Sequence, residues 1–297
     1  MRDELEGKVV KMQGGVIMVY ADHQLYPCDI KGNLKKSQKI LVGDNVEIDK
    51  DEYTDKRFLI TKLLPRKNLL PRPPLANIDN LFIVCSSLPK PDLLLLDKMI
   101  IYCNLNNINP ILVINKCDIA PLNEINAIIS QYEKVVGEII VVSGLTGEGI
   151  TKIKEKLIGK TSAFTGQSAV GKSTLINKLC PELGLETNGL SRKTDRGKHT
   201  TRHNEIFTFP DFFLADTPGF SMLSLKGIDS NNLHKFYKEF EPFEDDCSFL
   251  NCTHINCNEK VCGVVNAVNS DKISSNRYNR YCKLYSQLKE EKEWLYD

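Results

Sequence analysis

Residues 166–174 limit the folds open to this chain more than any other segment does. They read GQSAVGKST and fit the pattern G-x-x-x-x-G-K-[ST] at every fixed position. The glycines of such a loop let backbone N–H groups wrap a phosphate, and the helix that follows adds the dipole of its N-terminus. A short run ends at Thr165, and the helix-forming stretch KSTLINKLC begins at Lys172. The segment therefore predicts a strand, a phosphate loop and a helix of an α/β domain.

This loop supplies most of the predicted nucleotide contacts. Lys172 is expected to reach the β- and γ-phosphates, and the Ser173 hydroxyl is expected to bind Mg²⁺. The loop by itself does not distinguish ATP from GTP. The residues assigned to nucleotide binding here are Gly166, Gln167, Ser168, Ala169, Val170, Gly171, Lys172, Ser173 and Thr174.

The tetrapeptide NKCD at residues 115–118 predicts the base. It follows an apolar run, and ligand sites of α/β sheets lie at the carboxyl ends of such strands. The carboxylate of Asp118 can accept hydrogen bonds from two donors on the Watson–Crick edge of guanine, whereas adenine offers no such pair. Lys116 can lie on the face of the base, and Asn115 can tie adjacent loops together. We therefore assign Asn115, Lys116, Cys117 and Asp118 to a guanine site, with GTP and GDP as ligands.

The order of the two motifs is unusual. Asp118 lies 48 residues before Gly166, whereas ordinary guanine-nucleotide switches have the phosphate loop first. Strand neighbours hold a parallel sheet together, and chain termini usually lie close on the surface, so a permuted chain can keep the same pocket. The order predicts a circular permutation. Our hypothesis is that it places the γ-phosphate sensor next to the C-terminal region, so that nucleotide state sets how the flanking domains bind RNA.

Two short motifs complete the predicted pocket. Ser143 and Gly144 end the run EIIVVS and fit the loop that caps the guanine carbonyl with a backbone N–H; an ordinary turn is the alternative. The sequence DTPG at residues 216–219 follows the run FFLA. Asp216 is expected to hold Mg²⁺ through water, and the Gly219 N–H is expected to sense the γ-phosphate.

The predicted machinery for hydrolysis lacks one familiar group. Many GTPases carry Gln near the D-x-x-G turn to orient water, but Phe220 follows Gly219 here. An apolar ring cannot orient water by a hydrogen bond, so intrinsic hydrolysis is expected to be slow. His199, in the basic segment GKHTTRH, is the candidate that completes the site; a histidine that faces phosphate or RNA is the alternative. Lys172, Thr200 and Thr201 are also assigned to catalysis and Thr201 to Mg²⁺, although the sequence leaves open which threonine reaches the ion.

The spacing of apolar runs divides the chain into three regions. Residues 1–70 carry short β-like runs, which predict a small β-barrel of the OB-fold type that commonly binds RNA. Residues 71–225 carry short, nearly continuous apolar runs, which predict the parallel sheet of an α/β GTPase domain. Residues 226–297 are polar and rich in helix formers, and predict a mainly α-helical domain. A net charge of +1 indicates no global attraction to nucleic acid, so RNA contacts need local basic patches.

A cluster of cysteines in the last region predicts a metal. Cys247, Cys252 and His254 are followed by Cys257 and Cys262, and three Cys with one His make an ordinary structural zinc set. A closed site with four protein ligands has no open position for catalysis. We therefore expect the metal to pin a small domain.

The N-terminus indicates where the protein acts. The first residues, MRDELEGK, are charged and do not form a signal peptide. The apolar runs are too short to span a bilayer. We expect a cytoplasmic monomer without membrane contact.

Together these motifs resemble those of the circularly permuted bacterial GTPases that act in small ribosomal subunit biogenesis, the RsgA/YjeQ family. The resemblance covers essentially the whole chain and includes RKNLLPRPPLANIDN, NKCD, GQSAVGKST, GKHTT, DTPGF, CxxxxCTH and RYNRY. It implies an OB-fold, a permuted GTPase domain and a zinc-binding domain. It also implies GTP hydrolysis stimulated by the small ribosomal subunit during late maturation, contact with its rRNA, bound Mg²⁺ and Zn²⁺, and a catalytic role for His199.

One departure from the family pattern affects the zinc ligands. Family members usually place five residues between the ligating His and the final Cys, whereas seven separate His254 from Cys262 here, with Cys257 between them. The run EKVCGV resembles the family's ending. We therefore assign Cys247, Cys252, His254 and Cys262 to zinc, with Cys257 as the rival of Cys262.

Two hypotheses of different classes follow. The first is a GTPase assembly factor that binds the small subunit. The second is an RNA-binding scaffold in which GTP is a slowly hydrolysed ligand that orders the loops, and Phe220 supports it. A translation or tRNA-modification GTPase fits less well, because the metal cluster and the small β domain sit elsewhere in such chains.

Overall fold

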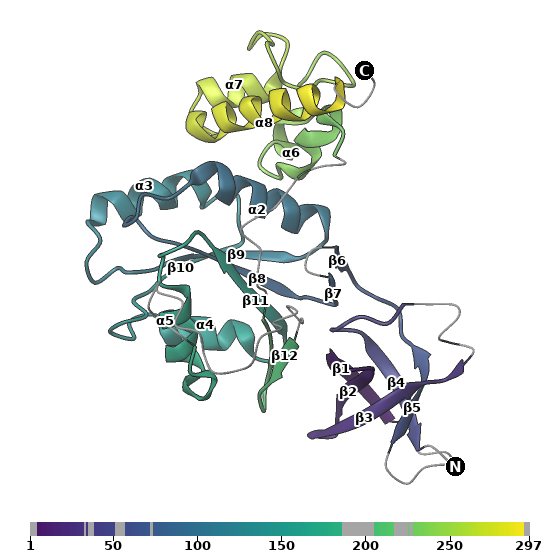
Figure 1. The fold of residues 1–297 in the computed structure, drawn as a ribbon. Coiled ribbons are helices and arrows are strands. Elements are labelled where there is room, and N and C mark those ends of the chain that lie inside the picture. The colour runs from purple at the N-terminus through teal and green to yellow at the C-terminus, as the bar shows by residue number, and fades with distance from the viewer. Residues whose placement is uncertain are drawn as a thin grey trace.

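The computed structural model describes residues 5–32, 34, 39–50, 57–71, 74–185, 205–216, 225 and 228–293. The described chain forms three regions in succession (Figure 1). They are a β-barrel, a sheet covered by helices on both faces, and a helical region that contains the cysteine cluster. This arrangement confirms the predicted fold class. The predicted boundaries at residues 70 and 225 stay predictions.

Five described strands close the N-terminal barrel. β1 pairs with both β2 and β4, and β3 pairs with β5, so the order β1-β2-β3-β5-β4 closes on itself. Alternate residues of β2 and β4 are buried, as the two-residue period of a strand requires. Gly14 and Gly15 turn the chain between β1 and β2 with φ angles of 60° and 81°. The strands are β1 (Leu5–Gln13), β2 (Val16–Ala21), β3 (Gln24–Ile30), β4 (Asn45–Lys50) and β5 (Phe58–Leu63).

A short antiparallel hairpin, β6 (Leu69–Pro71) and β7 (Pro74–Ala76), leads from the barrel into the central sheet. The sheet runs in the order β10-β9-β8-β11-β13-β12, in which β12 is antiparallel to β13 and the other pairs are parallel. β8 is buried along its whole length, which explains its continuous apolar sequence. The strands are β8 (Asn80–Cys85), β9 (Asn109–Ile114), β10 (Glu138–Val141), β11 (Thr161–Gly166), β12 (Glu205–Thr208) and β13 (Phe213–Asp216).

Helices cover both faces of this sheet. α2 (Leu93–Leu105) and α3 (Leu122–Tyr132) lie on one face, and α4 (Ile150–Leu157) and α5 (Lys172–Leu179) lie on the other (Figure 1). Two separate buried clusters correspond to these layers. In α4, Ile150, Ile153 and Leu157 form the buried stripe at the spacing that one helix face requires.

The sheet brings the reversed motifs together. β11, which ends in the phosphate loop, lies between β8 and β13, and β9, which ends before NKCD, is the next strand beyond β8. These strands are parallel, so their carboxyl ends meet at one edge of the sheet. Their spatial order is therefore independent of their order along the chain.

The C-terminal region packs on the outer surface of α2 (Figure 1). Its buried cluster is built around Tyr237, Phe240 and Tyr281, and Ile101 of α2 belongs to the same cluster. Among the residues described, no helix combines the length and apolar character that a membrane span requires. The elements are the 3₁₀ helix η2 (Ser230–Phe236), α6 (Glu241–Glu244), α7 (Gly263–Asn269) and α8 (Ser275–Glu293).

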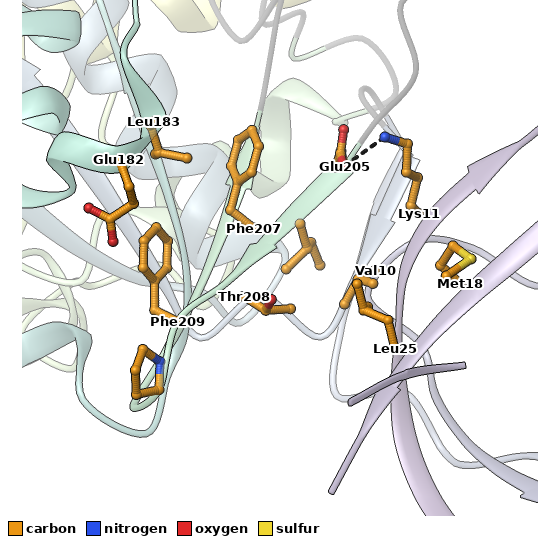
Figure 2. Close-up of a pocket in the computed structure, with 12 residues that line it drawn as sticks. Val10, Lys11, Met18, Leu25, Glu182, Leu183, Glu205, Phe207, Thr208 and Phe209 are labelled. Carbon is orange, nitrogen blue, oxygen red and sulfur yellow. Dashed lines mark hydrogen bonds and ion pairs between the residues drawn. The ribbon is translucent and has the colours of Figure 1, made fainter. Parts of the chain in front are cut away.

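The barrel meets the central sheet at β12. Lys11 of β1 pairs with Glu205 of β12, and their side chains form an ion pair of 2.9 Å. Next to this pair a groove of about 430 Å³ lies between the barrel and the sheet, lined by Leu25, Phe207 and Phe209 among others (Figure 2). The short 3₁₀ helix η1 (Pro181–Leu183), which follows α5, borders the same groove.

Candidate active site and metal centre

The phosphate loop joins the end of β11 to the start of α5. Its two motif glycines lie where neighbouring groups leave no room for a side chain. A Cβ on Gly166 would come within 2.2 Å of the Val84 carbonyl oxygen, and one on Gly171 within 2.6 Å of Asn115 Nδ2. Gly171 also has a φ of 84°, in the left-handed region that favours glycine. The fold of this loop therefore requires glycine at both positions.

The rest of the loop divides into an outward and an inward part. Ser168 and Ala169 are exposed, whereas Val170 is 1% exposed and packs under the loop. Lys172, Ser173 and Thr174 form the first turn of α5. Their backbone N–H groups stand at the helix N-terminus, where the dipole favours an anion.

Asn115 joins three loops at the end of β9. Its Nδ2 donates to the Val170 carbonyl at 2.9 Å and, more weakly, to the Gly171 carbonyl at 3.4 Å. Its Oδ1 accepts from the Gly144 N–H at 2.9 Å. The side chain is 2% exposed, so these hydrogen bonds form away from water and fix the loops to one another. The base motif and the phosphate loop thus form one site.

Lys116 and Asp118 lie on the open side of the same loop. Lys116 Nζ donates to the Ala169 carbonyl and to the Leu88 carbonyl, each at 2.8 Å, which lays its stem along the phosphate loop. Asp118 is exposed, so its carboxylate is accessible to a ligand. Partial burial raises the pKa of the Cys117 thiol, so the variable position of the motif is neutral at pH 7.

The third loop explains the glycine at position 144. A Cβ there would lie 3.1 Å from both the N and the Cα of Leu175 in α5, which is tighter than ordinary packing. Ser143 is buried, and its Oγ accepts from the Thr146 N–H at 3.1 Å. The Gly144 N–H already donates to Asn115, so the assignment of this loop to the guanine carbonyl stays a prediction.

A fourth loop, residues 86–92 after β8, borders the site and was missed by the sequence reasoning. Besides the Leu88 carbonyl that holds Lys116, it offers the Asp92 N–H, which donates to Gln167 Oε1 at 2.9 Å. The signal that could have found it is its position directly after an apolar run that proves to be the strand beside β11. Loops at the carboxyl ends of adjacent parallel strands share a ligand site.

Several predicted site residues lie outside the described residues. They are His199, Thr200, Thr201 and Gly219, together with Phe220. The backbone of Asp216 is described and ends β13, which pairs with β11. Asp216 is thus at the sheet edge that carries the phosphate loop, and the roles of all these residues stay predictions.

The cysteine cluster has the geometry of a zinc site. One ligand atom from each of Cys247, Cys252, His254 and Cys262 lies within 4.8 Å of the others. The Sγ atoms of Cys247 and Cys252 are 3.8 and 3.9 Å from the Sγ of Cys262, and His254 Nδ1 is 3.4 Å from that sulfur. Sulfur ligands about 2.3 Å from one tetrahedral Zn²⁺ lie about 3.8 Å apart. The four side chains therefore fit zinc.

Burial and neighbouring groups also suit a cation here. Burial raises the pKa of the Cys262 thiol to about 12, and a bound divalent cation would stabilise its thiolate. On the far side of the imidazole, His254 Nε2 lies 3.3 Å from Glu244 Oε1. A carboxylate at that position orients a ligating histidine and fixes its tautomer.

Cys257 lies beside the cluster but outside the set of four. Its Sγ is 3.7 Å from Cys252 Sγ and donates to the Ile255 carbonyl at 3.4 Å. It does not belong to the group whose ligand atoms all lie within 4.8 Å of one another. This placement supports the choice of Cys262, which stays a prediction.

Comparisons with known families and proteins agree with this geometry. The family model described as RsgA GTPase matches residues 63–226, and the model described as RsgA N-terminal domain matches residues 6–55. The chain is 37% identical over 292 residues to the small ribosomal subunit biogenesis GTPase RsgA of Alkaliphilus metalliredigens, covering 97% of this chain and 99% of that protein. It is 38% identical over 295 residues to the protein of the same name from a Geobacillus species, covering 97% and 98%.

Two solved structures share the whole architecture. YjeQ from Thermotoga maritima superposes with a TM-score of 0.84 at 31% identity, covering 96% of this chain and 98% of that one. YloQ, described as a circularly permuted GTPase, superposes with a TM-score of 0.82 at 27% identity, covering 97% and 96%. The reversed motif order is therefore shared with a solved relative.

Proposed function

The chain belongs to the RsgA GTPase family, and on that premise we propose how its residues divide the work of binding and hydrolysing GTP. It is a P-loop GTP hydrolase of small ribosomal subunit biogenesis. The observation that carries the residue assignment is the contact of Asn115 with Val170 and Gly144. That contact supports a single pocket for base and phosphates despite the reversed order of the motifs.

In this proposal the phosphate loop holds the triphosphate and the NKCD loop holds guanine. Backbone N–H groups of residues 166–174 and the Lys172 ammonium bind the phosphates, while Asp118 accepts from the base. Ser173, Asp216 and one threonine of the pair Thr200 and Thr201 hold Mg²⁺. The ion, when bound, neutralises charge on the β- and γ-phosphates.

The C-terminal metal is proposed to be Zn²⁺ with a structural role. Cys247, Cys252, His254 and Cys262 fill four positions and leave none open for a substrate. Zinc would then stabilise the C-terminal fold and take no part in hydrolysis.

We further propose that the small subunit and its rRNA complete the hydrolysis site. Phe220 cannot orient the attacking water by a hydrogen bond, so another group or a partner must complete the site, and His199 is the candidate within the chain. The relatives are named for small ribosomal subunit biogenesis, which fits a cytoplasmic protein that acts as a monomer on that particle.

The test is GTP turnover with and without purified small subunits. We expect the subunits to raise turnover of the unmodified protein, and His199→Ala to lose that stimulation while it still binds GDP. His203→Ala, in the same basic segment, is the matched control and should keep the stimulation. Equal, negligible turnover with and without subunits would favour the RNA-binding scaffold in which GTP is a slowly hydrolysed ligand.

A further inference from the structure

Helix α8 of the C-terminal region contacts the GTPase domain through two arginines. Arg277 Nη1 donates to Asp97 Oδ1 at 2.5 Å, and Arg280 Nε donates to Asp97 Oδ2 at 2.5 Å. Asp97 lies in α2 and is fully buried. Two guanidinium groups on one helix therefore hold both oxygens of one carboxylate on another helix, in hydrogen bonds of the charge-assisted kind.

Arg280 also holds α3. Its Nη1 donates to Gln131 Oε1 at 3.1 Å, and its Nη2 lies 3.2 Å from the hydroxyl of Tyr132. That hydroxyl in turn donates to Asp97 Oδ1 at 2.6 Å. Gln131 and Tyr132 end α3, and the same helix begins four residues after Asp118. Arg280 thus bridges two helices, one of which starts beside the base motif.

The other bridged helix, α2, starts beside the phosphate loop. The loop at residues 86–92 leads into it, and Asp92 is its N-cap. The Asp92 N–H donates to Gln167 of the phosphate loop, and the Leu88 carbonyl holds Lys116. A shift of α2 along its axis would therefore move groups that position both Gln167 and Lys116.

We propose that Arg280 is a positioning residue for the guanine-nucleotide site, which it serves by holding α2 and α3 against the C-terminal region. The inference rests on the proposed function, because it takes Lys116 and Gln167 as nucleotide contacts. A coupling free energy is reciprocal, so nucleotide binding also stabilises the contact of α8 with α2.

Arg280 is a better test residue than Arg277. The Arg280 side chain is 15% exposed, and its loss leaves Asp97 paired with Arg277. Arg277 is 1% exposed and binds Glu239 as well, so its loss tests folding first. Arg280→Ala therefore removes the hydrogen bonds from α8 to α3 and one of its two links to Asp97, with the smaller disturbance.

The first experiment measures the dissociation constant for fluorescent GDP. Arg280→Ala is expected to weaken GDP binding about fivefold or more, within the usual range of couplings between sites. Arg280→Lys should weaken it less, because the ammonium keeps the charge but lacks the planar fork that reaches Asp97, Gln131 and Tyr132. Lys283→Ala, an exposed cation on the same helix, is the matched control and should bind GDP as the unmodified protein does. An Arg280→Ala variant that folds and binds GDP within about twofold of the unmodified protein would overturn the proposal.

The second experiment uses only the unmodified protein, so it tests the proposed coupling even if Arg280→Ala fails to fold. Hydrogen exchange of the unmodified full chain is measured with and without saturating GDP. We expect GDP to slow exchange in α8 around Arg277 and Arg280 more than in strand β2 of the barrel. Equal exchange in α8 in both states contradicts the proposal. If the unmodified chain binds no GDP, the proposed function fails as well; if it binds GDP while α8 is unaffected, only this inference fails.

Discussion

The GTPase domain contacts each of its two neighbours through an ion pair, and the two pairs differ in exposure. Towards the barrel, Lys11 and Glu205 form an ion pair whose side chains are each 34% exposed, beside the groove of Figure 2. Towards the C-terminal region, Arg277 and Asp97 form an ion pair whose side chains are at most 1% exposed. Water and salt screen the first pair but not the second. The exposed pair therefore contributes less to holding the barrel on β12 than the buried pair contributes to holding the C-terminal region on α2.

The buried junction is stable only with its full set of partners. Arg277 also donates to Glu239, and its guanidinium carbon lies 4.7 Å from the ring centre of Tyr237. Asp97 accepts from two arginines and one tyrosine. Such a network has a large desolvation penalty, and removal of one member leaves a charge buried without its partner. We therefore expect larger effects from substitutions in the C-terminal region than from substitutions at the exposed pair of the barrel.

The largest effect is expected from loss of a zinc ligand, because the metal holds the fold that presents Arg277. Structural zinc contributes about 10–16 kcal/mol in small domains at pH 7. Cys262→Ala should therefore lose bound zinc and release the C-terminal region from α2. The measurement is zinc per protein chain after gel filtration. Cys257→Ala is the matched control and should keep its zinc; full zinc in Cys262→Ala would assign the fourth position to Cys257.

The next effect is expected from Arg277→Ala. Breaking a buried ion pair by removing one partner costs about 3–5 kcal/mol. Urea unfolding, followed by circular dichroism, should show this loss. Asn276→Ala, at an exposed neighbouring position on α8, should stay within about 0.5 kcal/mol. A similar, small effect of both substitutions would show that the buried junction is no firmer than an exposed one.

The parts of the site that the sequence predicted are those whose chemistry is local. The phosphate loop needs glycine at two positions because Val84 and Asn115 leave no room for a side chain, and both glycines are fixed positions of the motif. The continuous apolar runs predicted the buried strands, because strands of a sheet covered by helices on both faces are apolar on both sides. Each of these features leaves a pattern in one short segment of the sequence, even where the groups that require it, such as Val84 and Asn115, lie in other segments.

The junction could not be predicted because its partners are far apart in sequence. Arg277 and Asp97 are separated by 180 residues, and the motif RYNRY does not indicate which carboxylate its arginines bind. The signal that existed is the lone acid in the apolar run LLLLDKMII, which a helix can bury only with a partner. Choosing that partner requires the packing of α8 on α2, which follows from the whole fold.

A smaller effect, at the barrel junction, depends on pH. Burial lowers the pKa of Lys8 from 10.5 to about 8, although Lys8 Nζ donates to Asn45 Oδ1 at 2.9 Å and lies over the ring of Phe213 in β13. The unfolded chain thus binds more protons than the folded chain between pH 8 and 10.5, and the free energy of unfolding rises with pH across this window. At pH 7 the ammonium of Lys8 is charged in both states, so the free-energy cost of burying it is fully present. We expect a rise of about 2–3 kcal/mol in the free energy of unfolding, measured by urea titration, from pH 7 to pH 10.

Lys8→Met separates this titration from others in the chain. It should abolish the rise, whereas Lys11→Met leaves Lys8 in place and should keep it. A rise of the same size in Lys8→Met would assign the pH dependence to another group. Together the two variants test whether the unfavourable energy at this junction comes from the buried ammonium of Lys8 or from the exposed ion pair of Lys11.

The smallest effect is expected from the exposed ion pair itself. Pairs of this kind contribute about 0.2–1 kcal/mol in double-mutant cycles, and salt reduces that value. A cycle of Lys11→Ala, Glu205→Ala and the double variant should therefore give a small coupling energy at low salt that falls at high salt. The free energies of unfolding come from urea titrations at both salt concentrations. A coupling above about 2 kcal/mol that salt does not change would mean that the barrel is held to β12 as a buried pair would hold it. The two ion pairs would then be alike in strength despite their different exposure.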